Sequence, residues 1–177
     1  MRVVAKLVVL SLVTAATAFA QSTHQVGPWS IYISAGDPNK MSLLQTTAVD
    51  QQGNGAPMKL DIICKNNKVA GIAIEMKTKI AKRDETYSQA VPTTHIVFTG
   101  EGQISEAENW AVADGGHTLY PYSELFQGKL NRIWVKRISG TQKLAIQLNQ
   151  TEDTESLAPV FDTADLAQAL SAVGCMQ

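Results

Sequence analysis

The stretch FDTADLAQALSAVGC, residues 161–175, closes the chain and predicts a short amphipathic helix that carries a cysteine. Leu166, Leu170 and Val173 recur at helical spacing, so they share one face of that helix. We expect the helix to span Thr163–Val173. Its apolar face has to be buried on another element, and the rest of the chain must supply that surface.

The first twenty residues have the features of a secretory signal peptide. Arg2 and Lys6 precede a short apolar run, and residues 18–20 read Ala-Phe-Ala, the A-x-A pattern of a cleavage site. We therefore expect residues 1–20 to be removed and residues 21–177 to form one periplasmic domain, with secretion beyond the periplasm as the alternative. No other apolar stretch approaches the roughly 20 residues that a membrane-spanning helix needs, so we expect no membrane span.

The two cysteines fit an exported protein. Cys175 follows Gly174, which suits the left-handed residue at a helix end, while Asp162 is a candidate cap at the helix start. Cys64 is the only other cysteine, and the pair lacks C-x-x-C spacing. In an oxidising compartment such a pair predicts a structural disulfide rather than a redox centre. A Cys64–Cys175 bond would tie the last helix to an earlier strand.

The charge of the mature chain is mildly acidic. Without Arg2 and Lys6, 13 basic residues stand against 16 acidic ones, a net charge of −3. This balance argues against nucleic acid or an anionic membrane surface as the main partner.

Short runs of alternating apolar and polar residues predict a mainly β fold. We expect a single antiparallel β-sandwich-like domain of two packed sheets, with a short mid-chain helix over 121–127 and the terminal helix tied back by the disulfide. The predicted strands lie at 29–34, 41–49, 58–64, 69–76, 94–98, 132–138, 143–149 and 157–161.

The hairpin around Asn66-Asn67 admits two registers. A two-residue turn would mix its apolar and polar faces, whereas a three-residue loop, 66–68, pairs Leu60 with Ile74, Ile62 with Ile72 and Cys64 with Ala70. Because a slip by one residue turns the apolar set outward, we favour the longer loop.

With these elements in order, the chain resembles a family of small exported accessory proteins of bacterial type VI secretion, the VasI or TagO type. The resemblance implies a disulfide-bonded, mainly β module of the cell envelope without enzymatic chemistry. It is carried by Trp29, the Leu60-x-Ile62-x-Cys64 strand, Trp110, Leu125-Phe126, Ile133–Val135, Phe161-Asp162, Leu166 and Cys175.

Four aromatic residues in a glycine-containing connection are the candidate binding site: Trp110, His117, Tyr120 and Tyr122. Large aromatic side chains in loops are frequent at binding surfaces. They also serve to pack a loop onto its own sheet, and their exposure distinguishes the two roles.

Catalytic signatures are sparse in the sequence. The histidines, His24, His95 and His117, lack ligand spacing, so we expect no metal, and we expect no cofactor. There is no G-x-S-x-G motif for a serine nucleophile. We therefore expect a non-enzymatic periplasmic binding or accessory module of the cell envelope, associated with a secretion system, whose partner is another envelope or secreted protein.

Two alternatives to an accessory module stay open. The first is a periplasmic inhibitor or immunity-type protein of an exported enzyme. The second is a small cell-wall hydrolase that uses acids in the segment we expect to be irregular, because paired carboxylates can cleave glycosidic bonds. The acids concerned are Glu101, Glu106, Glu108 and Asp114.

Overall fold

The computed structural model describes most of the chain after the predicted signal peptide. The described residues are 22–34, 36–37, 40–48, 58–76, 79, 93–100, 104–121, 127–148 and 158–175. The signal peptide and nearly all of the helix predicted at 121–127 lie outside these ranges, so both stay predictions.

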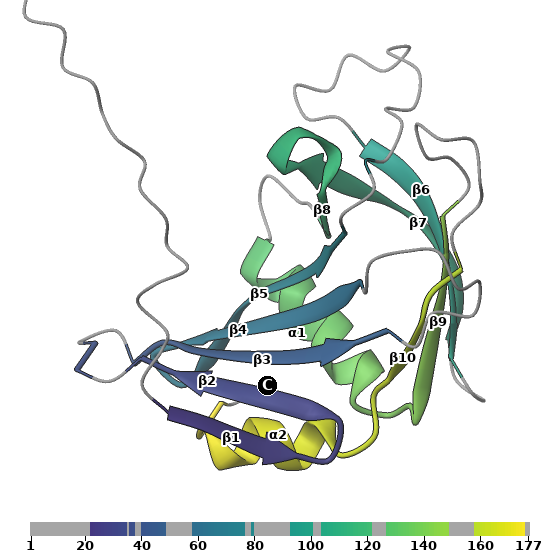
Figure 1. The fold of residues 1–177 in the computed structure, drawn as a ribbon. Helices are drawn as coiled ribbons and strands as arrows, with labels where there is room; N and C mark the ends of the chain where they lie inside the picture. Colours follow the sequence, from purple (N-terminus) through teal and green to yellow (C-terminus); the bar gives the residue numbers. More distant parts are fainter. Residues whose placement is uncertain are drawn as a thin grey trace, which may run out of the picture.

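The fold is mainly β and antiparallel, as the sequence predicts (Figure 1). The described strands form one continuous sheet in the order β1-β2-β3-β4-β5-β8-β7-β6-β9-β10. They are β1 (Ser22–Val26), β2 (Trp29–Ile33), β3 (Ser42–Thr47), β4 (Lys59–Lys65), β5 (Lys68–Glu75), β6 (Thr93–Gly100), β7 (Ile104–Ala113), β8 (Thr118–Tyr120), β9 (Lys143–Leu148) and β10 (Val160–Asp162). Two α-helices accompany them, α1 (Gln127–Ile138) and α2 (Leu166–Ala172).

The sheet bends so that its two halves form the layers of a sandwich-like domain. In Figure 1 the strands β1 to β5 lie at a steep angle to β6, β7 and β9, and α1 lies behind the first group. The last strand, β10, returns to β3, where the Thr46 hydroxyl donates a hydrogen bond to the Asp162 carbonyl (3.2 Å). The two expected sheets are therefore two halves of one hydrogen-bonded sheet.

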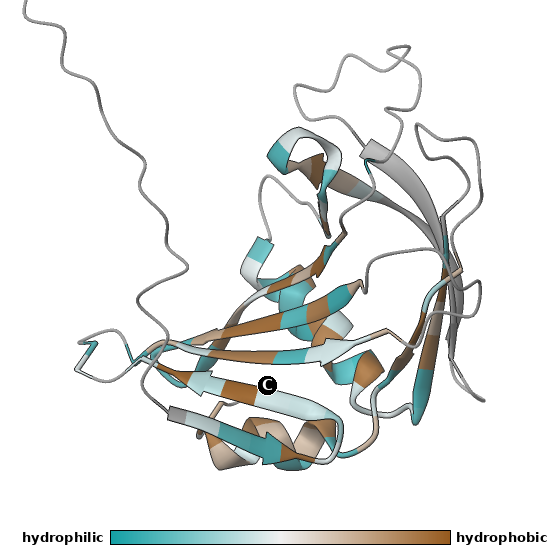
Figure 2. Ribbon diagram, in the orientation of Figure 1, coloured by the Kyte–Doolittle hydropathy of each residue, from teal (hydrophilic) through white to brown (hydrophobic). Residues whose placement is uncertain are grey.

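One hydrophobic core joins both halves and both helices. Its largest fully buried side chains are Trp29, Trp110, Trp134 and Phe161, which come from β2, β7, α1 and β10. Figure 2 shows apolar residues (brown) and polar residues (teal or white) alternating along several strands, as expected where one face of a strand is buried. Burying aromatic residues of this size stabilises a single domain of this length.

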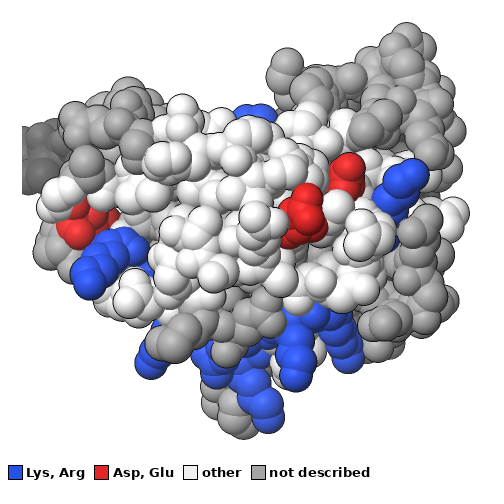
Figure 3. Space-filling view, turned by 90° about the horizontal axis from the view of Figure 1, so that it is seen from below, with Lys and Arg blue, Asp and Glu red and all other residues white. Residues whose placement is uncertain are grey.

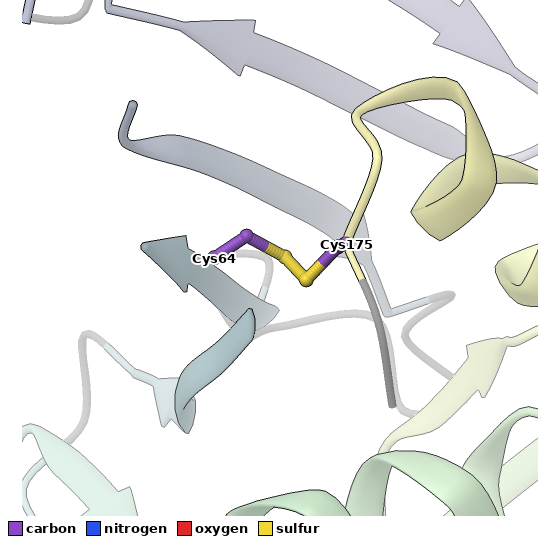
Figure 4. Close-up of a disulfide and its surroundings, with 2 residues drawn as sticks. All are labelled: Cys64 and Cys175. Atoms are coloured by element: carbon purple, nitrogen blue, oxygen red, sulfur yellow. A yellow bond between two sulfur atoms is a disulfide. The ribbon is translucent and has the colours of Figure 1, made fainter. Parts of the chain in front are cut away.

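The C-terminal stretch forms the predicted helix and the predicted disulfide (Figure 4). The Cα atoms of Cys64 and Cys175 are 6.0 Å apart. Gly174 has a φ of +65°, and the Cys175 amide donates to the Leu170 carbonyl (2.9 Å), a pattern typical of a Schellman helix end.

The start of α2 differs from the prediction. Left-handed Asp165, not Asp162, precedes the first helical residue, and the helix is shorter than predicted at both ends. The Asp162 carboxylate instead accepts a hydrogen bond from the Ala164 amide (3.0 Å). The indole of Trp29 donates to the Ala164 carbonyl (2.9 Å), which fixes the turn before the helix.

The β4–β5 hairpin combines the two registers considered from the sequence. Leu60 pairs with Ile74 and Ile62 with Ile72, as predicted, but Cys64 pairs with Val69 rather than Ala70. Asn66 and Asn67 both have positive φ and form a two-residue turn, so the predicted three-residue loop is wrong. A β-bulge that leaves Ala70 without a pair absorbs the extra residue.

The predicted strand at 132–138 is also wrong, because this segment belongs to α1. Trp134, Val135 and Ile138 are fully buried, which is the spacing of a helix face rather than that of a strand. The hairpin predicted from 132–138 and 143–149 is therefore a helix followed by β9.

The segment 100–120, which was predicted to be irregular, contains β7 and β8, joined by a 3-10 turn, η2 (Asp114–Gly116). Among the described residues, no helix has the length and apolar character needed to span a membrane.

Candidate functional site

The predicted aromatic residues do not come together as one exposed cluster. Trp110 lies in β7 and has no exposed surface. His117 and Tyr120 are half-buried, and Tyr122 lies outside the described residues. The His117 ring nitrogen Nδ1 lies 3.1 Å from the Met76 carbonyl, and the Met76 amide donates to the His117 carbonyl (2.8 Å). His117 thus holds the end of β5 against the turn before β8.

Trp110 supports another surface from beneath. Its ring packs edge-on against Trp134 of α1, with ring centroids 5.4 Å apart and an interplanar angle of 76°. The guanidinium of Arg137 lies over the Trp134 ring, 5.2 Å from its centroid. Trp110 therefore contributes to the position of a cation at the outside of α1, although it cannot itself contact a ligand.

The exposed side of α1 carries an unusual set of side chains, which we call the basic face. It consists of the exposed Lys129, Arg132, Ile133 and Lys136 and the half-buried Arg137. Residues three and four apart on a helix are neighbours, so Ile133 lies next to Lys129, Lys136 and Arg137. Ile133 is 38 % exposed and is the one large hydrophobic residue that is exposed among the described residues.

The charge of the basic face is of one sign. The sequence of α1 contains four cations and no acidic residue. In the view from below, lysine and arginine side chains gather along one edge of the molecule, on the side where α1 lies (Figure 3). Lys136 and Arg137, in the last turn, stabilise the helix through its dipole, whereas Lys129, near the first turn, destabilises it. Helix stability therefore accounts for only part of this charge.

The buried side of α1 holds the basic face in place. The buried Asn131 side-chain amide donates to the carbonyl of Ala70 in the bulge of β5 (2.8 Å). The Gln127 side-chain amide donates to Asn131 Oδ1 (3.2 Å) and to the backbone carbonyl of Pro121. At the other end, the Thr141 hydroxyl donates to the Ile138 carbonyl (2.9 Å). Hydrogen bonds at both ends thus tie α1 to β5 and to the segments that precede and follow the helix.

The acids considered for a hydrolase are distributed over regular elements. Glu106 and Glu108 lie in β7, Asp114 is an exposed residue of the 3-10 turn, and Glu101 lies outside the described residues. No group of three metal-ligating side chains occurs among the residues that the structure describes.

A different carboxyl group has an unusual environment. Asp61 of β4 is only 4 % exposed, and burial raises its pKa to about 7. The Gln45 amide donates to its Oδ1 atom (2.8 Å), and Glu75 and Lys59 are its charged neighbours. Asp61 was not among the residues predicted as a site, although an acid inside an apolar strand is a signal that the sequence contains.

Comparison with models of known protein families, with curated proteins and with solved structures finds no match for this chain.

Proposed function

We propose that the protein is a non-enzymatic binding module of the bacterial cell envelope and that the basic face of α1 contacts another exported protein. The observation that carries the proposal is the exposed Ile133 among four cations, on a helix whose other side is fixed in the core. Arginine residues and an apolar residue at the centre of a charged surface are frequent where proteins bind one another.

Export to the periplasm is part of the same proposal. The predicted signal peptide supports it, and so does the Cys64–Cys175 disulfide, because such bonds persist in oxidising compartments. The resemblance to the VasI or TagO type supplies a context, an accessory role in type VI secretion. An inhibitor or immunity-type protein would use the same surface, and the identity of the partner separates the two roles.

A comparative pull-down from periplasmic extract tests the proposal. The bait is the mature chain, residues 21–177, next to the double variant Lys129→Gln/Lys136→Gln and the control Lys65→Gln/Lys68→Gln. The control removes the same charge from the exposed β4–β5 turn. We expect a stoichiometric protein that the wild type and the control retain and the α1 variant loses. Recovery of the same proteins by all three baits would contradict the proposal.

A further inference from the structure

We propose that the partner of the basic face is an acidic protein surface whose carboxylates surround an apolar pocket that receives Ile133. This inference rests on the proposed function and names the chemistry of the partner. It follows from the distribution of charge over the chain, from the exposure of one isoleucine and from the fixed position of α1.

The basic face concentrates four positive charges on one helix of a protein that is acidic overall. Outside residues 1–20 and the four cations of α1, nine basic residues remain against 16 acidic ones. Charges are screened over about 8 Å in physiological salt, and twelve helical residues extend over about 18 Å. A partner of limited size can therefore meet the four cations and avoid the acidic remainder. An extended polyanion or a flat anionic bilayer would also meet the repelling charges.

The exposure of Ile133 indicates that the partner is not only charged. Apolar residues at the centre of an interface contribute when the partner excludes water from them. At 38 % exposure Ile133 has surface left to bury, and its helical neighbours Lys129, Lys136 and Arg137 surround it. A carboxylate ring around an apolar pocket complements this arrangement in both charge and shape.

Arginine at the basic face favours carboxylate as the partner group. A guanidinium forms two parallel hydrogen bonds with a carboxylate, and its planar geometry makes the contact directional. Arg137 lies over the ring of Trp134, which itself packs on Trp110. The position of this cation is therefore set before the partner arrives, which lowers the entropy lost on binding.

The apolar side of α1 argues against insertion into a lipid bilayer. A helix that binds a membrane surface presents a wide apolar face to the lipid. In α1 the residues of that face, Trp134, Val135 and Ile138, are fully buried in the protein core. Only Ile133 is left for the lipid, so the geometry favours a protein surface.

Binding of designed peptides to the mature chain tests this inference without knowledge of the natural partner. The probes are a synthetic peptide with glutamates around one leucine and the same peptide with serine in place of leucine. We expect about tenfold tighter binding of the leucine peptide, because a buried leucine strengthens binding by at least that factor. The Ile133→Ser variant should lose this preference and keep its affinity for the serine peptide.

The charge variants supply the matched control. Lys129→Gln/Lys136→Gln should weaken the binding of both peptides several-fold, and Lys65→Gln/Lys68→Gln should leave both affinities unchanged. Vesicles of phosphatidylglycerol and a short DNA duplex serve as phosphate-bearing competitors. Tighter binding of either through the basic face would overturn the inference, as would no binding of the peptides or equal binding of both.

The two proposals fail in different experiments. If the pull-down recovers an α1-dependent partner but the peptide test fails, the acidic partner is wrong and the binding function stands. If the pull-down shows no dependence on α1, the binding function itself is wrong.

Discussion

The buried carboxyl of Asp61 couples the stability of the fold to pH. Burial, Glu75 and a hydrogen bond with it raise the pKa to about 7, whereas Gln45 and Lys59 act in the opposite direction. The folded state therefore binds a proton more tightly than the unfolded state, whose aspartate has a pKa near 3.8. Stability from this group is fully present below about pH 4 and is lost as the pH rises to about 7.

We accordingly predict that Asp61→Asn stabilises the protein at pH 8 and has little effect at pH 4. Asparagine keeps the oxygen that accepts from Gln45, and its amide can donate to Glu75. The gain at pH 8 should be about 2–4 kcal/mol in the free energy of unfolding, measured by urea titration at several pH values. Asp114→Asn, at an exposed turn, controls for net charge. A gain that is equal at both pH values would contradict the assignment.

A single glycine fits the β1–β2 turn against the start of α2. Gly27 has a φ of +53°, and a Cβ atom there would lie 2.5 Å from Asp165 Oδ2. We predict that Gly27→Ala destabilises the protein by about 2 kcal/mol, from the left-handed backbone and the contact together. Adding Asp165→Gly removes the contact but not the backbone cost at residue 27, so thermal unfolding should show partial recovery beyond the effect of Asp165→Gly alone, which relieves the left-handed backbone of residue 165. No loss of stability in the single variant would argue against this packing.

The elements predicted correctly are those in which the apolar residues fit only one repeat, that of a strand or that of a helix. In β4, Leu60, Ile62 and Cys64 alternate cleanly, and the structure buries all three. In α1, the β-branched residues Ile133, Val135 and Ile138 suggested a strand, although Leu130, Trp134 and Ile138 also recur every four residues. The core decided in favour of the helix, because Trp134 packs on Trp110, more than 20 residues earlier.

The bulge in β5 shows why the register could not be derived in full. The sequence indicates which residues face the core, but not that Ala70 is extruded. The carbonyl of Ala70 instead accepts a hydrogen bond from Asn131, a contact between elements 61 residues apart. Local patterns contain no information on such a partner.

The contact between α1 and the bulge gives a prediction at the scale of the element. Asn131→Leu should cost about 0.5–1.5 kcal/mol, because it removes the hydrogen bond that the Asn131 side chain donates to the Ala70 carbonyl. Chemical denaturation measures the loss. Because Asn131 also orients Gln127, the variant should expose the start of α1 to faster amide hydrogen exchange. Unchanged exchange in α1 would mean that the hydrogen bond does not hold the helix.

Across the whole molecule, the sequence predicts the Cys64–Cys175 disulfide correctly but does not predict the basic face of α1. The aromatic residues predicted as a site include Trp110, which is buried in the core. The basic face could not be recognised from the sequence, because its segment was predicted to be a strand. The predicted strand, 132–138, excluded Lys129 and separated Arg137 from Arg132 and Lys136, because neighbouring residues of a strand point to opposite faces. The four cations are seen to share one face only when their segment is placed on a helix.

The Cys64–Cys175 disulfide is the feature that acts on the entire chain, since it joins positions 111 residues apart. Such a bond stabilises mainly by restricting the unfolded state, so removing either cysteine should cost about 2–5 kcal/mol. We predict that Cys64→Ala and Cys175→Ala lose similar amounts in urea unfolding and that the double variant loses no more than either alone. Reduced wild-type protein should match the double variant. Alkylation of the native protein, purified without reductant, should detect no free thiol, and two free thiols, or additive losses, would show that the bond does not close the fold.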